Sequence, residues 1–268
     1  KKKKGDYYLT DVIGLASEDG VLIDSIKPQT TEEIFGVNDK TQLAEAEKHK
    51  RKQAADRLLQ DGVTLADPER IDVRGELICG KDVFIDVNVV FEGNVKISEG
   101  SSIGPHSVIS NSTIGKHTKI LSHCNLEHVI VGNDCSVGPF ARLRPGTELM
   151  DSARAGNFVE IKKSQIGQQS KVNHLSYIGD AVVGKEVNIG AGTITCNYDG
   201  ANKHQTIIED NVHIGSGVEL VAPVAVKEGA TIGAGSTITK HAPKNKLTLE
   251  RARQKTIPNW QRPKKKTT

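Results

Sequence analysis

The sequence predicts an all-β fold, a parallel β-helix built from hexapeptide repeats. Three observations predict it. A small aliphatic residue returns every six positions over most of the 268-residue chain, glycine often follows that residue, and the apolar spacing near 3.6 that a helix needs is absent. A β-sandwich is less compatible, because it would alternate with period two and show hairpin turns.

The repeats are clearest in the second half of the chain, where three hexads would close one triangular coil of eighteen residues. The phase slips by one residue twice, and the rhythm stops after Ile189 and resumes at Ile208. Weaker repeats begin near residue 78. The residues expected to point inward are Ile78, Phe84, Val90, Ile97, Ile103, Ile109, Ile114, Val131, Val137, Leu143, Leu149, Ala155, Ile161, Ile166, Val172, Ile178, Val183, Ile189, Ile208, Ile214, Leu220, Val226, Ile232 and Ile238.

Four segments are expected along the chain. Residues 1–38 carry short β-like runs such as VLIDSI, and residues 39–70 form a helical linker in which Asp39 and Gln42 are suited to a capping box. Residues 71–240 form the β-helix. Residues 241–268 leave the rhythm and are expected to be an extended tail.

Composition argues against several classes of partner. The net charge is only +3 and aromatic residues make up 4% of the chain, so neither a polyanion surface nor stacking platforms for bases are expected. No apolar run approaches the length of a membrane span, and no signal peptide is recognised. The four cysteines show no CxxC spacing, which suits a reduced cytoplasm and no structural metal.

A polar stretch, TCNYDGANKHQT at 195–206, interrupts the repeats. A polar loop that leaves the solenoid adds nothing to its buried core, so such a loop indicates a function. Nearby, Arg144 and Lys162 are eighteen residues apart and should lie on the same side of adjacent coils. His174 follows Lys162 by only twelve, so a corner or a neighbouring chain must bring it to them. Two cations and a histidine suit a small phosphorylated substrate and one proton transfer, although a solvated charged face fits the charges equally well.

The words GPFARLRPG, GNFVE, NHLSYIGD, NIGAGTITCNYDGANK and VAPV resemble one family closely. They are similar to the acetyltransferase domain of the bifunctional bacterial glucosamine-1-phosphate acetyltransferase/N-acetylglucosamine-1-phosphate uridyltransferases. DYYLTDVIGLA and FGVND resemble the end of the family's uridyltransferase domain, so residues 1–38 are expected to be its remnant. The family's glycine-rich nucleotide loop is not found in this sequence. Asn38 matches a Mg²⁺-site residue of that domain, and its partner carboxylate would lie in the missing part, so no metal is expected.

The resemblance implies a left-handed β-helix, a cytoplasmic homotrimer and a small-molecule substrate. The implied reaction transfers acetyl from acetyl-CoA to the 2-amino group of glucosamine 1-phosphate. Its product would serve UDP-N-acetylglucosamine synthesis, and through it peptidoglycan, lipopolysaccharide and cell shape. Uridyltransferase activity is expected to be absent from this chain.

The resemblance also implies roles for matching residues. His174 would be the general base. The residues expected to bind the sugar phosphate are Arg144, Lys162, Tyr177, Asn188 and Lys203. The residues expected to line the acetyl-CoA site are Ala191, Asn197, Tyr198, Ser216, Ala234 and Arg251.

Two other functions compete with this one. The first is a zinc enzyme of the carbonic anhydrase type, which would need His174, His204 and His213 to converge on a metal. The second is a trimeric scaffold without catalysis. Metal analysis would test the first, and an acetyl-transfer assay would test the second.

Overall fold

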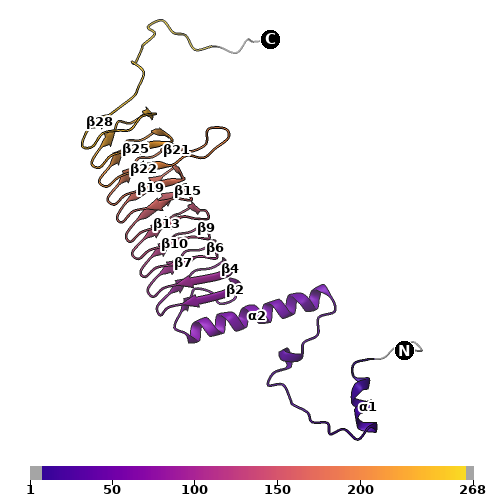
Figure 1. Ribbon diagram of the computed structural model, residues 1–268. Helices are drawn as coiled ribbons and strands as arrows, with labels where there is room; N and C mark the ends of the chain where they lie inside the picture. Colours follow the sequence, from indigo (N-terminus) through magenta and orange to yellow (C-terminus); the bar gives the residue numbers. More distant parts are fainter. Residues whose placement is uncertain (1–7, 264–268) are drawn as a thin grey trace, which may run out of the picture. The chain divides into compact units, whose positions relative to one another are not determined.

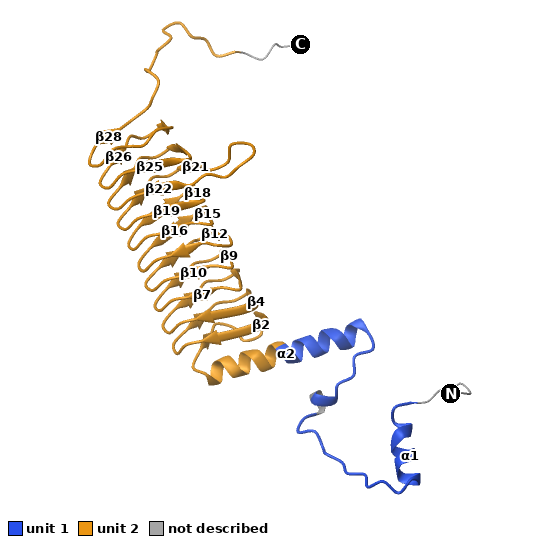
Figure 2. Cartoon of the chain, viewed as in Figure 1, with its two compact units in different colours: residues 1–50 blue, residues 51–268 orange. Residues whose placement is uncertain are grey.

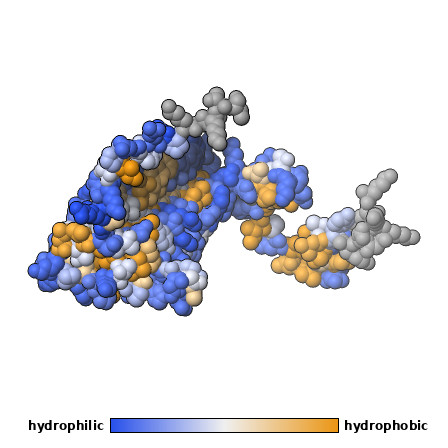
Figure 3. Space-filling view, turned by 90° about the horizontal axis from the view of Figure 1, so that it is seen from above, coloured by the Kyte–Doolittle hydropathy of each residue, from blue (hydrophilic) through white to orange (hydrophobic). Residues whose placement is uncertain are grey.

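The computed structural model describes residues 8–263 of the chain, which divides into two compact units, residues 1–50 and 51–268 (Figure 2). The described part of the first unit holds α1 (Asp11–Glu18), η1 (Thr31–Ile34) and the first half of α2 (Lys40–Gln60). It contains no strand, although VLIDSI was expected to be β-like, because a strand without partners is not stable in water. Much of this unit's apolar surface is exposed (orange in Figure 3).

Helix α2 begins where the sequence predicts. The backbone N–H of Gln42 donates to the Asp39 carboxylate at 2.8 Å, and the Gln42 side chain accepts from the backbone N–H of Asn38 at 2.7 Å. The predicted capping box is therefore present, with the return contact made one residue earlier than expected. The second half of α2 belongs to the second unit, where Ala55 and Leu58 are buried in the core cluster and close the first end of the solenoid.

The second unit is a left-handed parallel β-helix with three faces, which we call A, B and C in chain order (Figure 1). Face A consists of β1 (Thr64–Leu65), β3 (Phe84–Ile85), β5 (Ser102–Ile103), β8 (Lys119–Ile120), β11 (Ser136–Val137), β14 (Arg154–Asn157), β17 (Lys171–His174), β20 (Asn188–Ile189), β23 (His213–Ile214), β26 (Thr231–Ile232) and β28 (Leu247–Thr248). Every strand pairs in parallel with the strand of the next coil.

Faces B and C share the two long strands β2 (Ile71–Cys79) and β4 (Val89–Ile97), which bend around a corner. Face B continues with β6 (Val108–Ser110), β9 (Asn125–Glu127), β12 (Arg142–Leu143), β15 (Glu160–Lys162), β18 (Tyr177–Gly179), β21 (Ile194–Cys196), β24 (Glu219–Val221) and β27 (Thr237–Ile238). Face C continues with β7 (Thr113–Ile114), β10 (Ile130–Val131), β13 (Glu148–Leu149), β16 (Gln165–Ile166), β19 (Ala181–Val183), β22 (Thr206–Ile208) and β25 (Val224–Val226).

The core is a column of stacked aliphatic side chains. Each inward residue predicted from Val131 to Ile238 is at most 3% exposed. In the first coils the predicted phase is wrong: Phe84 is 38% exposed, whereas Ile85 and Phe91 are buried. A shift of one residue turns the side chains of a strand to its opposite face. In these coils the long strands continue around a corner, so the six-residue spacing of inward residues is not regular there.

Two further features follow from coil length. The two phase slips correspond to coils of seventeen residues, as in the pairing of Ile161 with Ile178. Regular pairing begins at Thr64 and ends at Thr248, so the solenoid extends slightly beyond the expected range of 71–240.

No helix in residues 8–263 is long and apolar enough to cross a membrane.

Candidate functional site

The polar interruption leaves the solenoid as a hairpin between β21 and β22 (Figure 1). The coil that contains it is twenty-five residues long, as the pairing of Ile194 with Glu219 shows. Tyr198 and Lys203 form an antiparallel bridge across the hairpin. The excursion expected from the sequence is therefore an ordered element.

The tip of the hairpin is organised by Asp199. Its carboxylate accepts hydrogen bonds from the backbone N–H groups of Ala201 at 2.8 Å and Asn202 at 2.6 Å. It also lies 2.7 Å from the Nε2 atom of His204. The bond from Asn202 is the largest of the effects that hold the pKa of the Asp199 carboxyl well below its usual range. An ionised Asp199 therefore fixes the hairpin's shape at neutral pH.

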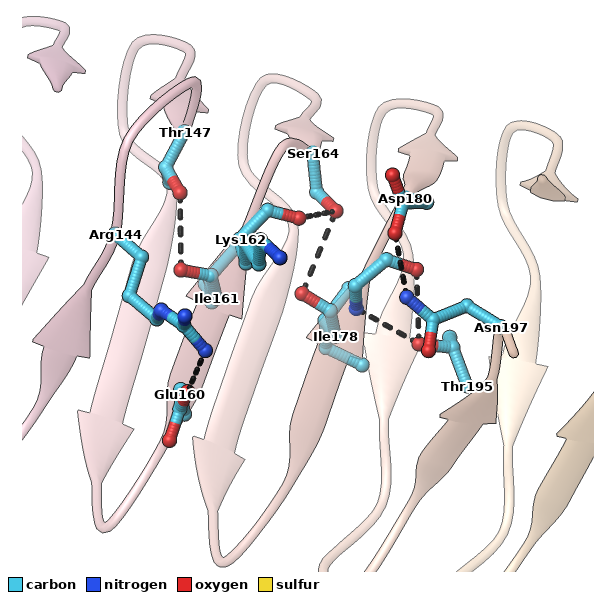
Figure 4. Close-up of polar contacts among 11 residues, drawn as sticks. Arg144, Thr147, Glu160, Ile161, Lys162, Ser164, Ile178, Asp180, Thr195 and Asn197 are labelled. Atoms are coloured by element: carbon cyan, nitrogen blue, oxygen red, sulfur yellow. Dashed lines mark hydrogen bonds and ion pairs between the residues drawn. The ribbon is translucent and has the colours of Figure 1, made fainter. Parts of the chain in front are cut away.

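The base of the hairpin is attached to the preceding coil. The side-chain amide of Asn197, only 7% exposed, donates to the Asp180 carboxylate (Figure 4). Beside it, the Thr195 hydroxyl accepts from the backbone N–H of Gly179 at 2.7 Å. These contacts set where the hairpin starts on the surface of the solenoid.

Three cations gather where the hairpin returns to the solenoid. Arg144 and Lys162 occupy equivalent positions in adjacent coils (Figure 4), and Lys203 lies near enough to Lys162 to perturb its ionisation. This proximity and the charge of Lys203 lower the pKa of Lys162, with smaller effects from desolvation and Arg144, while Asp180 opposes them. Arg144 is partly neutralised by Glu160, at 2.8 Å. Like charges held this close favour an anion such as a phosphate bound between them.

His174 lies at the end of β17, at the corner where face A meets face B. Its side chain is exposed, and its Nδ1 atom lies 2.7 Å from the Oδ1 atom of Asn157 in the preceding coil. One ring nitrogen is therefore held by the protein. The other has no partner among the described residues.

Successive coils place further predicted residues on the line that passes through His174. The register of β17, β20, β23 and β26 aligns His174 with Ala191, Ser216 and Ala234. Arg251 lies beyond them, beside Gly235. These four residues, predicted for the acetyl-CoA site, thus follow the same corner toward the C-terminal end of the solenoid.

The side chains at this corner become smaller beyond His174. In the earlier coils its left-handed position holds bulky side chains, and the rings of His106, His123, Phe140 and Phe158 stack at centroid distances of 4.8–5.4 Å. In the later coils this position holds glycine at 192, 217 and 235. A Cβ atom added to these glycines would meet no atom closer than 3.6 Å, so packing does not require glycine, although the positive φ at all three positions favours it. Its effect is to leave the corner open beyond His174.

Within one chain, His174 and the cation cluster lie at opposite ends of face B. Lys162 pairs with Gly179, which follows His174 by five residues. This path turns at Leu175, whose φ is 47°, so the five residues span at most about 16 Å of backbone. A single chain therefore presents two groups of predicted residues, one around His174 and one around the three cations, and we call these groups half-sites.

The remaining predicted residues divide between the two half-sites. Asn188 lies on β20, three residues before Ala191, on the His174 side. Tyr177 directs its hydroxyl over Gly179, whose added Cβ would lie 2.5 Å from that oxygen, so it belongs with the cations. Asn197 and Tyr198, predicted for acetyl-CoA, lie in the hairpin beside the cations rather than near Ala191 in the same chain.

The sequence analysis missed three residues that touch these groups: Asn157, Glu160 and Asp180. The coil length would have found the first, because Asn157 precedes His174 by seventeen residues. For the zinc alternative, the described residues bring together no group of three or more potential ligands, and His204 is bonded to Asp199.

Two family models match the chain: the GMPPB C-terminal domain over residues 73–150, and the bacterial transferase hexapeptide, six repeats, over residues 205–240. Among curated proteins, the bifunctional protein GlmU of Ralstonia pickettii is 58% identical over 260 residues, and that of Cupriavidus pinatubonensis is 57% identical over 263. These matches cover 97% and 98% of this chain. It belongs to the GlmU family. The chain corresponds to the C-terminal portion of GlmU and spans 57% and 58% of the length of these two relatives.

A solved structure supports the fold of this GlmU portion. The UDP-N-acetylglucosamine acyltransferase of Francisella novicida superposes with a TM-score of 0.51 at 16% identity, covering 69% of this chain and 66% of that one. At this identity the likeness concerns the fold alone, and it agrees with the hexapeptide β-helix.

Proposed function

We propose that the chain transfers acetyl from acetyl-CoA to the 2-amino group of glucosamine 1-phosphate, giving N-acetylglucosamine 1-phosphate for UDP-N-acetylglucosamine synthesis. The observation that carries this proposal is the gathering of Arg144 and Lys162 at equivalent positions of adjacent coils, with Lys203 near enough to lower the pKa of Lys162. Three cations at this spacing suit the two negative charges and several acceptor oxygens of a sugar phosphate. Membership of the GlmU family supports the same substrate.

The first step is removal of a proton. The 2-amino group is an ammonium in water and cannot attack a thioester until it loses a proton. His174 is exposed, has one ring nitrogen with no partner in residues 8–263, and belongs to the residue type that titrates nearest neutral pH. It accepts the proton and becomes an imidazolium.

The second step is acyl transfer. The free amine attacks the thioester carbonyl, a C–N bond forms, and the carbonyl oxygen becomes an oxyanion. The backbone N–H of Ala191 lies one coil beyond His174 and makes no hydrogen bond among the described residues, so it is free to donate to that oxyanion. The C–S bond then breaks, and CoA leaves as a thiol with the proton returned by His174. The attacking nitrogen loses its second proton to solvent, which leaves the neutral amide.

The two half-sites give a reason for assembly. On one chain, His174 lies at the corner before face B, whereas Lys162 pairs with Gly179 at the far end of β18, and this separation along face B favours a site shared between chains. We propose a homotrimer in which each complete site takes His174 from one chain and the cation cluster from its neighbour. The acetyl-CoA would lie along the open corner at Ala191, Ser216 and Ala234.

The four cysteines are free thiols, which suits reaction in the cytoplasm. We also propose that this chain alone does not transfer uridylyl groups, because its sequence holds no glycine-rich phosphate loop.

The direct test measures free CoA thiol with acetyl-CoA and three acceptors: glucosamine 1-phosphate, glucosamine 6-phosphate and glucosamine. Rapid turnover with the 1-phosphate alone is expected. No turnover with any acceptor would favour the scaffold alternative, and equal turnover with all three would remove the phosphate-binding role of the cations. Pyrophosphate release from UTP and N-acetylglucosamine 1-phosphate, measured in parallel, would contradict the absence of uridylyl transfer.

A further inference from the structure

Among the side chains of residues 8–263, only Asn157 makes a polar contact with the His174 ring. It lies in the motif GNFVE, but the sequence analysis assigned it no role. The two residues are directly paired across neighbouring coils in the register of β14 and β17. The backbone N–H of Leu175 also donates to the carbonyl of Asn157 at 3.1 Å. Both side chains therefore leave a backbone whose position is fixed by pairing.

The atoms that meet decide which tautomer the ring adopts. The Oδ1 atom of Asn157 only accepts hydrogen bonds, so the Nδ1 atom that faces it at 2.7 Å must carry the hydrogen. In a neutral imidazole the other nitrogen, Nε2, then holds the lone pair. With the opposite tautomer, the lone pair would point at Asn157 and could not reach a substrate.

We infer that Asn157 is a positioning residue for His174, which holds the ring as the Nδ1–H tautomer and presents the Nε2 lone pair to the amine. The inference rests on the proposed acetyl transfer. The proton from the amine goes to Nε2, while the hydrogen on Nδ1 stays bonded to Asn157 throughout.

Because the Asn157 side chain is uncharged, it orients His174 without favouring the protonated ring. A carboxylate at this position would accept the same hydrogen bond but would also stabilise the imidazolium through its charge. The ring would then be protonated up to a higher pH and could accept no proton there. An amide orients the ring without this cost.

The kinetic test compares Asn157→Leu, Asn157→Asp and a matched control. Asn157→Leu keeps the size of the side chain and removes the acceptor. Its kcat is expected to fall about 10–100-fold with both KM values unchanged, the usual effect of removing a partner that orients a functional histidine. The control is Asn111→Leu, since Asn111 contacts His128 across neighbouring coils at a distant corner, and its kcat should stay at the wild-type value.

Asn157→Asp keeps the acceptor and adds charge. Its kcat is expected to exceed that of Asn157→Leu at high pH, and the acidic limb of its pH–rate profile should move to higher pH than in the wild type. A purely structural role for Asn157 would move no limb. An unchanged profile in Asn157→Asp, or wild-type kcat in Asn157→Leu, would overturn the inference.

A second measurement does not depend on turnover. Nitrogen-15 NMR of histidine-labelled full chain, with the His174 signal assigned through His174→Gln, reports which ring nitrogen carries the hydrogen. The Nδ1–H form is expected in the wild type, and a mixture of tautomers in Asn157→Leu. An Nε2–H form in the wild type would overturn the inference. If the wild type showed no acetyl transfer, the proposed function would fail, and the NMR result would still decide the tautomer.

Discussion

At the scale of single residues, the function depends on two kinds of contact that the solenoid brings about differently. His174 is held by a residue directly beside it in the coil ladder, whereas Lys162 meets a residue from the hairpin. The first contact follows from coil spacing. The second follows from the local hydrogen bonds of the hairpin, so the sequence rhythm alone could not predict it.

Replacing His174 by alanine removes the proposed proton acceptor. We expect His174→Ala to lower kcat by about 10²–10⁴, the range typical of a general base, with little change in either KM. Steady-state kinetics with both substrates varied would measure this. Near-normal turnover in the variant would show that another group removes the proton.

The lowered pKa of Lys162 gives a pH dependence of binding. In the free site Lys203 favours loss of the proton from Lys162, whereas a bound phosphate favours the charged form. Affinity for glucosamine 1-phosphate should therefore fall as pH rises through the lowered pKa, with proton uptake on binding. Calorimetry in buffers of different ionisation enthalpy would detect that uptake.

The matched variants for this prediction are Lys162→Arg and Lys163→Arg. A guanidinium stays charged, so Lys162→Arg should bind without proton uptake, while the exposed neighbour Lys163→Arg should behave as the wild type. If both variants take up protons as the wild type does, Lys162 is not the group that titrates.

At the scale of elements, the sequence predicted the coils where the inward residue is repeated by every strand, and failed where strands are long. From Val131 onward each hexad holds one short strand, and the stacked aliphatic column is as expected. In β2 and β4 nine residues run across a corner, so Phe84 was assigned to the core in place of Ile85. The sequence could not show that the predicted residues divide into two half-sites, because a motif does not indicate which corner of the solenoid each of its residues occupies.

The stacked column also predicts how stability responds to substitution. Ile161 is completely buried, and Ile161→Ala should lower the free energy of unfolding by about 2–5 kcal/mol through lost burial and the cavity left behind. Ile130→Ala is the matched control, because Ile130 is 55% exposed on a strand of the same solenoid. Its effect should stay within about 0.5 kcal/mol. Equal losses for both variants in denaturant unfolding would contradict the inward assignment of Ile161.

At the scale of the whole molecule, the separation of the half-sites makes activity a property of the assembly. His174 stands at one end of face B and Lys203 joins the cations at the other, so each proposed site draws them from different chains. The cysteines compete weakly in a thiol-based assay of that activity, because burial raises the pKa of Cys79 to about 12, of Cys124 and Cys135 to about 11, and of Cys196 above its ordinary value. Released CoA is therefore expected to react much faster than these protein thiols.

Mixed trimers of two inactive chains test the shared site. His174→Ala and Lys203→Ala chains should each assemble into trimers of low activity, since every site in them lacks one group. In a cyclic trimer with two chains of one kind and one of the other, one interface joins an intact His174 to an intact Lys203, and one interface lacks both. Trimers isolated through two affinity tags should therefore regain about one third of wild-type activity per trimer. If they show no gain over either parent, the two residues act from the same chain, and the wide separation along face B must be closed by some movement within it.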